Sequence, residues 1–282
     1  MKKTLLMLAV ALLCACSSDD ETSQNSNLNP ETTEVTVGFD GFTLEQESMS
    51  TRLSAVGEIC TKLDVWVYEG STEFATYQQE SGTDGFGTLS LTLNVQKEYT
   101  IYAVAHKAAD HATLSNSVIT FPENKVTHTF FIKHTFTPTK GMNLNLEMSR
   151  IVAQFSFNTT DAVPDWCKTM RFTISDVYDR WNVSTGATHQ LDRVSTFQNF
   201  STRADGTVTF NVYAIVTDEA TNHDILVEGL DANGDVQESH TLYDVPLTNN
   251  QRTVATGCFF SDAASAFSFL AADWLDDANF SF

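Results

Sequence analysis

Histidine and acidic side chains are the residues of this chain that could hold a metal ion. His128 and His134 lie on one face of an expected strand. Such a pair is a candidate for zinc binding, but an exposed strand face explains it more simply. Residues 231–235 begin like a calcium loop, yet the EF-hand pattern then needs Gly where Val236 stands and Glu where Leu242 stands. We therefore predict a hairpin turn at residues 231–235, and no metal or cofactor site.

The cysteines and the common catalytic motifs likewise give no sign of a functional site. Cys60, Cys167 and Cys258 follow the leader without Cys-x-x-Cys spacing, so neither a thiol–metal site nor a disulfide framework is implied. Each is more often a small buried residue, and the sequence leaves open whether two of them pair. The nucleophile elbow, the P-loop, the dinucleotide fingerprint and the HExxH motif are all missing. We predict no catalytic residue and no enzymatic activity, although a glycosidase carboxylate pair would leave no such motif.

The N-terminus has the features of an export signal. Residues 1–15 combine Lys2 and Lys3 with an apolar stretch too short to span a membrane. The run 13–16, Leu-Cys-Ala-Cys, resembles a bacterial lipobox, whose last cysteine is acylated and becomes the mature N-terminus. Ala15 is the small residue expected before that cysteine, so Cys16 is the predicted lipidation site, and the chain would be anchored by lipid rather than span the membrane. An ordinary signal peptide with incidental cysteines is the alternative.

A polar segment and a strongly acidic balance follow. Residues 16–33 are poor in apolar residues and predict a disordered tether. The acidic run 19–21 resembles the surface-export signal of lipoproteins from Gram-negative anaerobes, with a plain soluble linker as the alternative. The formal net charge of −20 repels phosphate backbones, so nucleic acid is excluded as an expected partner.

The remaining chain is typical of an all-β protein with many short strands and turn signals every ~8–12 residues. At residues 142–157, Met142 to Met148 alternate with polar residues, and after Arg150 a second alternation begins in the opposite phase. A phase flip re-aims the buried face, so we predict an N-terminal β-sandwich at residues 34–148 and a C-terminal one at residues 149–282. Expected strands cover residues 34–40, 63–68, 74–79, 89–95, 99–104, 126–136, 142–148, 151–157, 170–177, 206–216, 225–230, 236–245, 252–260 and 266–270, with residues 110–117 as loop or helical turn.

Several runs, in this order and spacing, resemble fimbrillin-like (type V) pilus subunits of Gram-negative anaerobes. They are residues 146–155, 161–164, 245–253 and 256–260, together with Trp274. The resemblance implies two tandem transthyretin-like β-sandwiches after a lipoprotein signal peptide. It also implies a surface-exposed outer-membrane lipoprotein of a fimbrium, with other pilus subunits and a host receptor or glycan as partners in adhesion.

In shaft subunits of that family, a trypsin-like protease cuts after an arginine and releases the first strand. Arg52, in the polar segment after the first expected strand, is the candidate cleavage site, with a plain surface arginine as the alternative. The strand released would carry Val35, Val37 and Phe39, and a strand from the next subunit would fill the groove. Phe280 and Phe282 alternate near the C-terminus and form the candidate donor strand.

Two points stay open. Acidic residues at 273, 276 and 277 interrupt the candidate donor, and anchor and accessory subunits are not processed, so shaft, tip and anchor roles remain alternatives. A non-catalytic, glycan-binding surface lipoprotein is the competing function, because tryptophan can form platforms for sugars. That function predicts at least two exposed, coplanar rings among Trp66, Trp166, Trp181 and Trp274.

Overall fold

The computed structural model describes residues 31–42, 56–261 and 267–272, and it is nearly all strand. The strands are β1 (Thr32–Phe42), β2 (Lys62–Glu69), β3 (Thr72–Glu80), β4 (Thr88–Asn94), β5 (Tyr99–His106), β6 (Thr113–Ser115), β7 (Val118–Thr120), β8 (Thr129–Phe136), β9 (Asn143–Arg150), β10 (Ala153–Thr159), β11 (Thr169–Asn182), β12 (Gly186–Gln198), β13 (Thr209–Ala214), β14 (Thr221–Leu230), β15 (Val236–Leu247), β16 (Arg252–Gly257) and β17 (Ser268–Ala272). Helix in this part of the chain is limited to α1 (Val56–Ile59) and the 3-10 turn η1 (Pro122–Asn124). The predicted all-β sandwich class is confirmed, and no described helix is long and apolar enough to cross a membrane.

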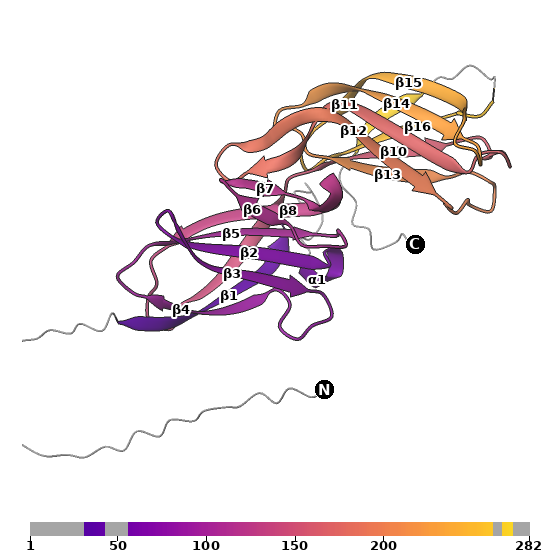
Figure 1. Cartoon of the computed structure of the whole chain (residues 1–282). Helices are drawn as coiled ribbons and strands as arrows, with labels where there is room; N and C mark the ends of the chain where they lie inside the picture. The colour runs from indigo at the N-terminus through magenta and orange to yellow at the C-terminus, as the bar shows by residue number, and fades with distance from the viewer. Residues whose placement is uncertain (1–30, 43–55, 262–266, 273–282) are drawn as a thin grey trace, which may run out of the picture.

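The N-terminal half is built from strands in the order β3-β2-β5-β8-β9-β1-β4 (Figure 1). β8 and β9 pair only at Phe130↔Arg150 and Phe131↔Ser149, so the hydrogen-bonded surface folds over at this point into two layers. The core lies between these layers and draws on β1, β4 and β9 from one side and β2, β5 and β8 from the other. This is the sandwich expected from alternating strands that bury one face each.

The predicted phase flip lies at the boundary of two separate cores. Leu146 and Met148 of β9 point into the N-terminal core, whereas Phe155 and Phe157 of β10 point into the C-terminal core. Between the two strands, Arg150 is 4% exposed and its guanidinium carbon lies 4.8 Å from the centroid of the Phe130 ring. Two residues between β9 and β10 are therefore enough to pass the chain from one core to the other.

The C-terminal half is a second pair of layers. One sheet has the order β13-β10-β16-β17, and the facing sheet contains β15, β14 and β11, with β12 paired to β11. Phenylalanine fills the core between them, since the Phe157 ring centroid lies 5.6 Å from that of Phe172 and 5.7 Å from that of Phe259. The predicted hairpin at residues 225–245 is present as β14 and β15.

The largest departures from the sequence prediction lie at residues 110–120 and 186–198. The first segment was expected to be loop or helical turn at 110–117, but it forms the β6–β7 hairpin. This hairpin comes from the N-terminal half and pairs with β11 of the C-terminal half, with Trp181 opposite Ile119. The second segment forms the whole of β12, for which no strand was expected.

An apolar cluster and a buried arginine join the two halves. The cluster contains Trp66, Val104, Ala112, Ile119, Phe121, Val126, Ile151, Val152, Trp181, Val183 and Ile215. Beside it, the Arg193 guanidinium of β12 donates hydrogen bonds to the carbonyl oxygens of Asn124 at 2.6 Å and Val126 at 3.3 Å. Burial lowers the pKa of Arg193 to about 10, so the group stays charged at neutral pH and binds both carbonyls as a cation.

Candidate functional site

β1 occupies an interior position in its layer. It pairs antiparallel with β4, with Val35 opposite Leu91, and parallel with β9, with Val37 opposite Leu144. Backbone bonds continue at its margins, where the Phe39 N–H donates to the Gly87 carbonyl oxygen at 2.8 Å. The first strand of the chain is therefore held by hydrogen bonds along both edges.

The apolar side chains of β1 form part of the N-terminal core. Val35 and Val37 are fully buried and Phe39 is 1% exposed. Glu34 and Thr36 alternate with them and point the other way, and the Glu34 carboxylate accepts a hydrogen bond from the Ser90 hydroxyl. The period-2 pattern read from the sequence is thus the pattern of burial in the structure.

Taking β1 away would leave a gap the width of one strand. Within the described residues β4 pairs with no strand other than β1, so β4 would lose its whole hydrogen-bond ladder. The gap would be flanked by apolar side chains of both neighbours: Leu89, Leu91, Leu93, Leu146 and Met148. Unpaired backbone groups beside apolar side chains are what an added extended segment satisfies.

Four other predicted site residues lie outside the described residues. They are the lipidation site Cys16, the cleavage site Arg52 and the donor residues Phe280 and Phe282. Arg52 falls in residues 43–55, which connect β1 to α1.

The tryptophans that the structure describes do not form an exposed platform. Trp66 is 4% exposed and Trp181 is 9% exposed, and both belong to the cluster between the halves. Trp166 is partly buried and packs edge-on against Phe260, with ring centroids 5.8 Å apart. The pair of exposed coplanar rings that a flat glycan platform requires is not found among these three.

The histidines considered for zinc have other partners. His128 lies just before β8, and its Nε2 is 2.7 Å from the Tyr213 hydroxyl oxygen, whereas His134 stacks on Phe136 with ring centroids 5.9 Å apart. In the described ranges no group of three or more His, Cys, Asp or Glu residues could hold a metal ion.

The acidic run at residues 231–235 is a hairpin turn, as predicted. The Asp231 carboxylate accepts hydrogen bonds from the backbone N–H groups of Asn233 at 2.8 Å and Asp235 at 3.0 Å, which lowers its pKa. Gly234 supplies the left-handed conformation that the turn needs, with φ of +85°.

The three cysteines after the leader are free thiols. Cys60 is 1% exposed and Cys167 is 6% exposed, as expected for small core residues, while Cys258 is only half-buried. Burial raises the pKa of Cys60 far above its usual value and also raises that of Cys167. Neither thiol is prepared to act as a nucleophile.

A buried carboxylate network in the N-terminal half was not predicted. Asp64 is fully buried and accepts hydrogen bonds from His106 Nε2 at 3.0 Å, His111 Nδ1 at 2.7 Å, Gln78 Nε2 at 3.1 Å and the Ala112 N–H at 2.9 Å. A lone aspartate inside the apolar run of residues 63–67 was the signal that could have indicated it. The network ties the loop before β6 to β2 and β5, and its role is to hold that loop.

Comparison with protein families identifies the family of this chain. A model described as a family of unknown function, DUF6562, matches residues 76–269. The chain belongs to this DUF6562 family. The match begins within β3, so it lies wholly after β1. Comparison with curated proteins gives no match.

Solved structures share the fold of this DUF6562 chain at low sequence identity. A candidate adhesin from Bacteroides thetaiotaomicron has a TM-score of 0.54 at 10% identity, covering 86% of this chain and 96% of that one. A candidate polysaccharide-binding protein from the same organism has a TM-score of 0.51, with the same identity and coverage. The fimbrial anchor protein Mfa2 from Porphyromonas gingivalis has a TM-score of 0.50 at 10% identity, covering 86% of this chain and 98% of that one.

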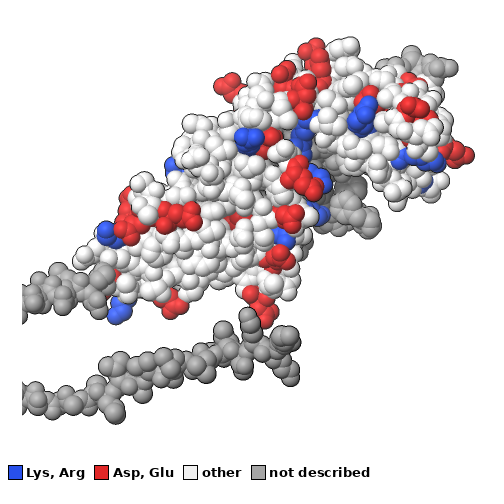
Figure 2. All heavy atoms as spheres, viewed as in Figure 1, with Lys and Arg blue, Asp and Glu red and all other residues white. Residues whose placement is uncertain are grey.

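The face of the DUF6562 protein in Figure 2 carries acidic side chains on both halves. Figure 2 shows Asp and Glu spread over this face of the molecule, with fewer Lys and Arg among them. Together with the net charge of −20, this surface suits contacts made by backbone pairing or apolar burial better than contacts with anionic polymers.

Proposed function

We propose that this DUF6562 protein is a structural or accessory subunit of a cell-surface pilus, assembled by β-strand donation and involved in adhesion. The supporting observation is the position of β1, an N-terminal strand held between β4 and β9 with its apolar residues buried. A strand in this position can be replaced by another strand with the same alternation of apolar and polar residues. The sequence resemblance to fimbrillin-like subunits and the fold shared with a fimbrial anchor protein point the same way.

In this proposal, proteolysis after Arg52 separates β1 from the rest of the chain. An extended segment of another subunit, for which we propose the end of the chain at Phe280 and Phe282, then pairs with β4 and β9. The donor and the groove are different surfaces, so each subunit uses one of each and the assembly grows as an open filament. We further propose that the two halves, residues 34–148 and 149–282, are tandem transthyretin-like sandwiches.

An arginine-specific protease tests this proposal. Treatment of the purified precursor should cut after Arg52 and be followed by growth to large assemblies, seen by size-exclusion chromatography. Arg52→Ala should block both steps, while the same substitution at the exposed Arg203 should block neither. Cleavage that leaves a stable monomer would contradict a shaft role and favour a tip or anchor role.

We propose that the protein reaches the outer surface as a lipoprotein carried by Cys16. The leader places a small residue before Cys16 and ends its apolar stretch there. Cys16→Ala should move the protein from the membrane fraction to the soluble fraction and abolish incorporation of labelled palmitate. Cys14→Ala is the matched control and should leave both unchanged; membrane retention of Cys16→Ala without label would refute the assignment.

A further inference from the structure

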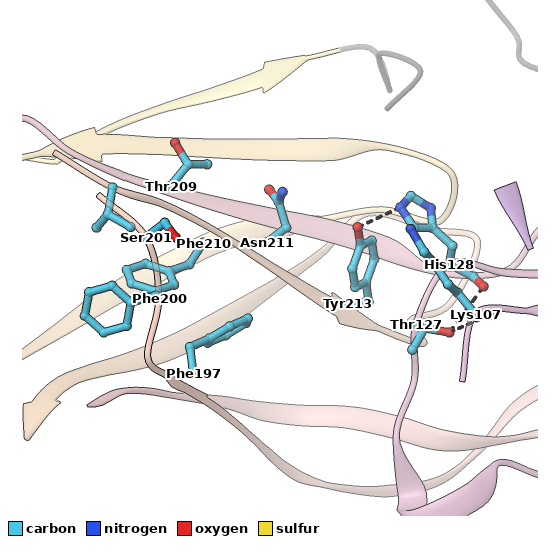
Figure 3. Close-up of a pocket in the computed structure, with 11 residues that line it drawn as sticks. Lys107, Thr127, His128, Phe197, Phe200, Ser201, Thr209, Phe210, Asn211 and Tyr213 are labelled. Carbon is cyan, nitrogen blue, oxygen red and sulfur yellow. Dashed lines mark hydrogen bonds between the residues drawn. The ribbon is translucent and has the colours of Figure 1, made fainter. Parts of the chain in front are cut away.

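A cavity of about 640 Å3 lies between the two halves, along the edge of β13 (Figure 3). Val208, Thr209, Phe210, Asn211 and Tyr213 line it, although neighbouring residues of a strand point to opposite faces. Only the edge of a strand is open to both faces at once. Among the described strands β13 pairs with β10 alone, so its other edge faces this space, which we term the junction cavity.

The hydrogen-bond register sends polar backbone groups into the junction cavity. The Thr159 N–H donates to the Val208 carbonyl oxygen at 3.1 Å, and the antiparallel register then assigns the backbone groups of Phe210 and Val212 to β10 as well. The N–H and C=O groups of Thr209 and Asn211 therefore point toward the cavity. They supply paired donors and acceptors at fixed positions.

The two ends of the junction cavity differ in chemistry (Figure 3). One end is aromatic, because Phe197 and Phe200 pack on Phe210 with ring centroids 5.2 Å and 5.0 Å away. The other end holds Tyr213, His128, Thr127 and Lys107, and Asn211 stands between the two ends. A ligand that fits must therefore present an apolar face and several hydrogen-bonding groups together.

The lining is also unusual in its charge. The chain carries 36 acidic residues, yet none of the eleven lining residues is Asp or Glu. Hydroxyl and amide groups predominate among the polar ones, and these both donate and accept. The one formally charged lining residue, Lys107, lies at the end away from Phe197 and Phe200 (Figure 3). Such a lining matches hydroxyl groups better than a metal ion, which prefers carboxylate oxygens.

We propose that the junction cavity binds a neutral saccharide residue. The carbon–hydrogen face of a pyranose ring packs on Phe197 and Phe200, and its hydroxyl groups bond to the side-chain N–H of Asn211 and to the backbone at the β13 edge. The other side-chain groups on this edge already have partners, because the Thr209 hydroxyl donates to Asn158 Oδ1 at 2.7 Å and Asn211 Oδ1 accepts from the Ser156 hydroxyl at 2.7 Å. The volume lies within the range of small-ligand sites, which form preferentially between domains. An added peptide strand fits less well, because the 2.7 Å contact of His128 with Tyr213 closes one end of the edge.

This inference goes beyond strand exchange and needs only the intact monomer, so either proposal can fail alone. Saturation-transfer NMR of the full chain with N-acetyl-D-glucosamine, D-galactose or D-mannose at about 10 mM should detect binding. A site with a Kd near 1 mM is still nearly saturated at that sugar concentration. We expect transfer to the ring protons of at least one of these sugars. Ser201→Trp, which fills the cavity from its exposed rim, and Phe200→Ala should each abolish it.

Two matched variants test whether a loss of transfer could come from misfolding. Ser184→Trp, in the exposed turn between β11 and β12, and Phe74→Ala, at a ring 46% exposed on β3, should retain the transfer. No transfer from the folded protein to any of the three sugars would overturn the proposal, and so would equal transfer in Ser201→Trp. Binding of a peptide of alternating Phe and Ser in place of the sugars would also overturn it and assign the edge to strand addition.

Discussion

A chain that begins at Leu53, and so lacks β1, should not form a stable monomer. Burial of a Val or Phe side chain contributes about 1.5–3 kcal/mol, and β1 buries Val35, Val37 and Phe39 together. The truncation also removes the only described pairing partner of β4. The net stability of a domain is about 5–15 kcal/mol, so the loss is comparable with the whole margin. We expect the truncated protein to aggregate or to lose its cooperative thermal transition.

A synthetic peptide of residues 32–42 should restore the transition when it is added during refolding. The matched control peptide carries Ser in place of Val35, Val37 and Phe39, which keeps the backbone donors and removes the apolar contacts. The control peptide should restore little of the thermal transition, because binding in the groove needs both the backbone hydrogen bonds and the apolar contacts. A truncated chain that melts cooperatively at the temperature of the full chain would show that β1 is not an integral strand.

Asp64→Ala should destabilise the protein by about 3–5 kcal/mol, the usual cost of removing one partner from a buried charged network. The Ala108 N–H donates to His106 Nδ1 at 3.2 Å, so the proton of the neutral ring lies on Nε2 and is donated to Asp64. Without the carboxylate, this buried donor and the Ala112 N–H lose their acceptor. Urea denaturation followed by circular dichroism measures the loss.

The position of the network predicts where the damage should appear. Residues 107–112 lead directly into the β6–β7 hairpin, in which β7 pairs with β11. Asp64→Ala should therefore speed amide hydrogen exchange at Ile119 more than at Phe157, in the C-terminal core. Asp84→Ala, at an exposed turn, is the control and should change neither. Unchanged stability in Asp64→Ala would mean that the four hydrogen bonds contribute little.

The alternation of apolar and polar residues predicted those strands that bury one face fully. β1, β4 and β9 carry an apolar residue at every second position, and the structure buries those residues against one core. The change of phase at Arg150 identified the passage between two cores, because a strand that enters a new core must turn its apolar side. These features depend on residues close together in the sequence, so they can be predicted from the sequence alone.

The elements that the sequence did not reveal depend on distant partners. β12 contains the exposed Val194 and few apolar residues, and it is a strand because β11 pairs with it along its length. The β6–β7 hairpin is too short to show a period, and β11 completes it from the other half. The junction cavity collects Lys107 with Phe200 and Asn211, which lie about a hundred positions further along the chain. Only the tertiary fold brings them together.

The most direct test of strand exchange is the N-terminal sequence of the protein taken from the cell surface. We expect the assembled form to begin at Leu53, with residues 16–52 absent from the purified filament by mass spectrometry. Mature protein in filaments that still begins at an acylated Cys16, with β1 covalently attached, would contradict the proposal that β1 is released and replaced.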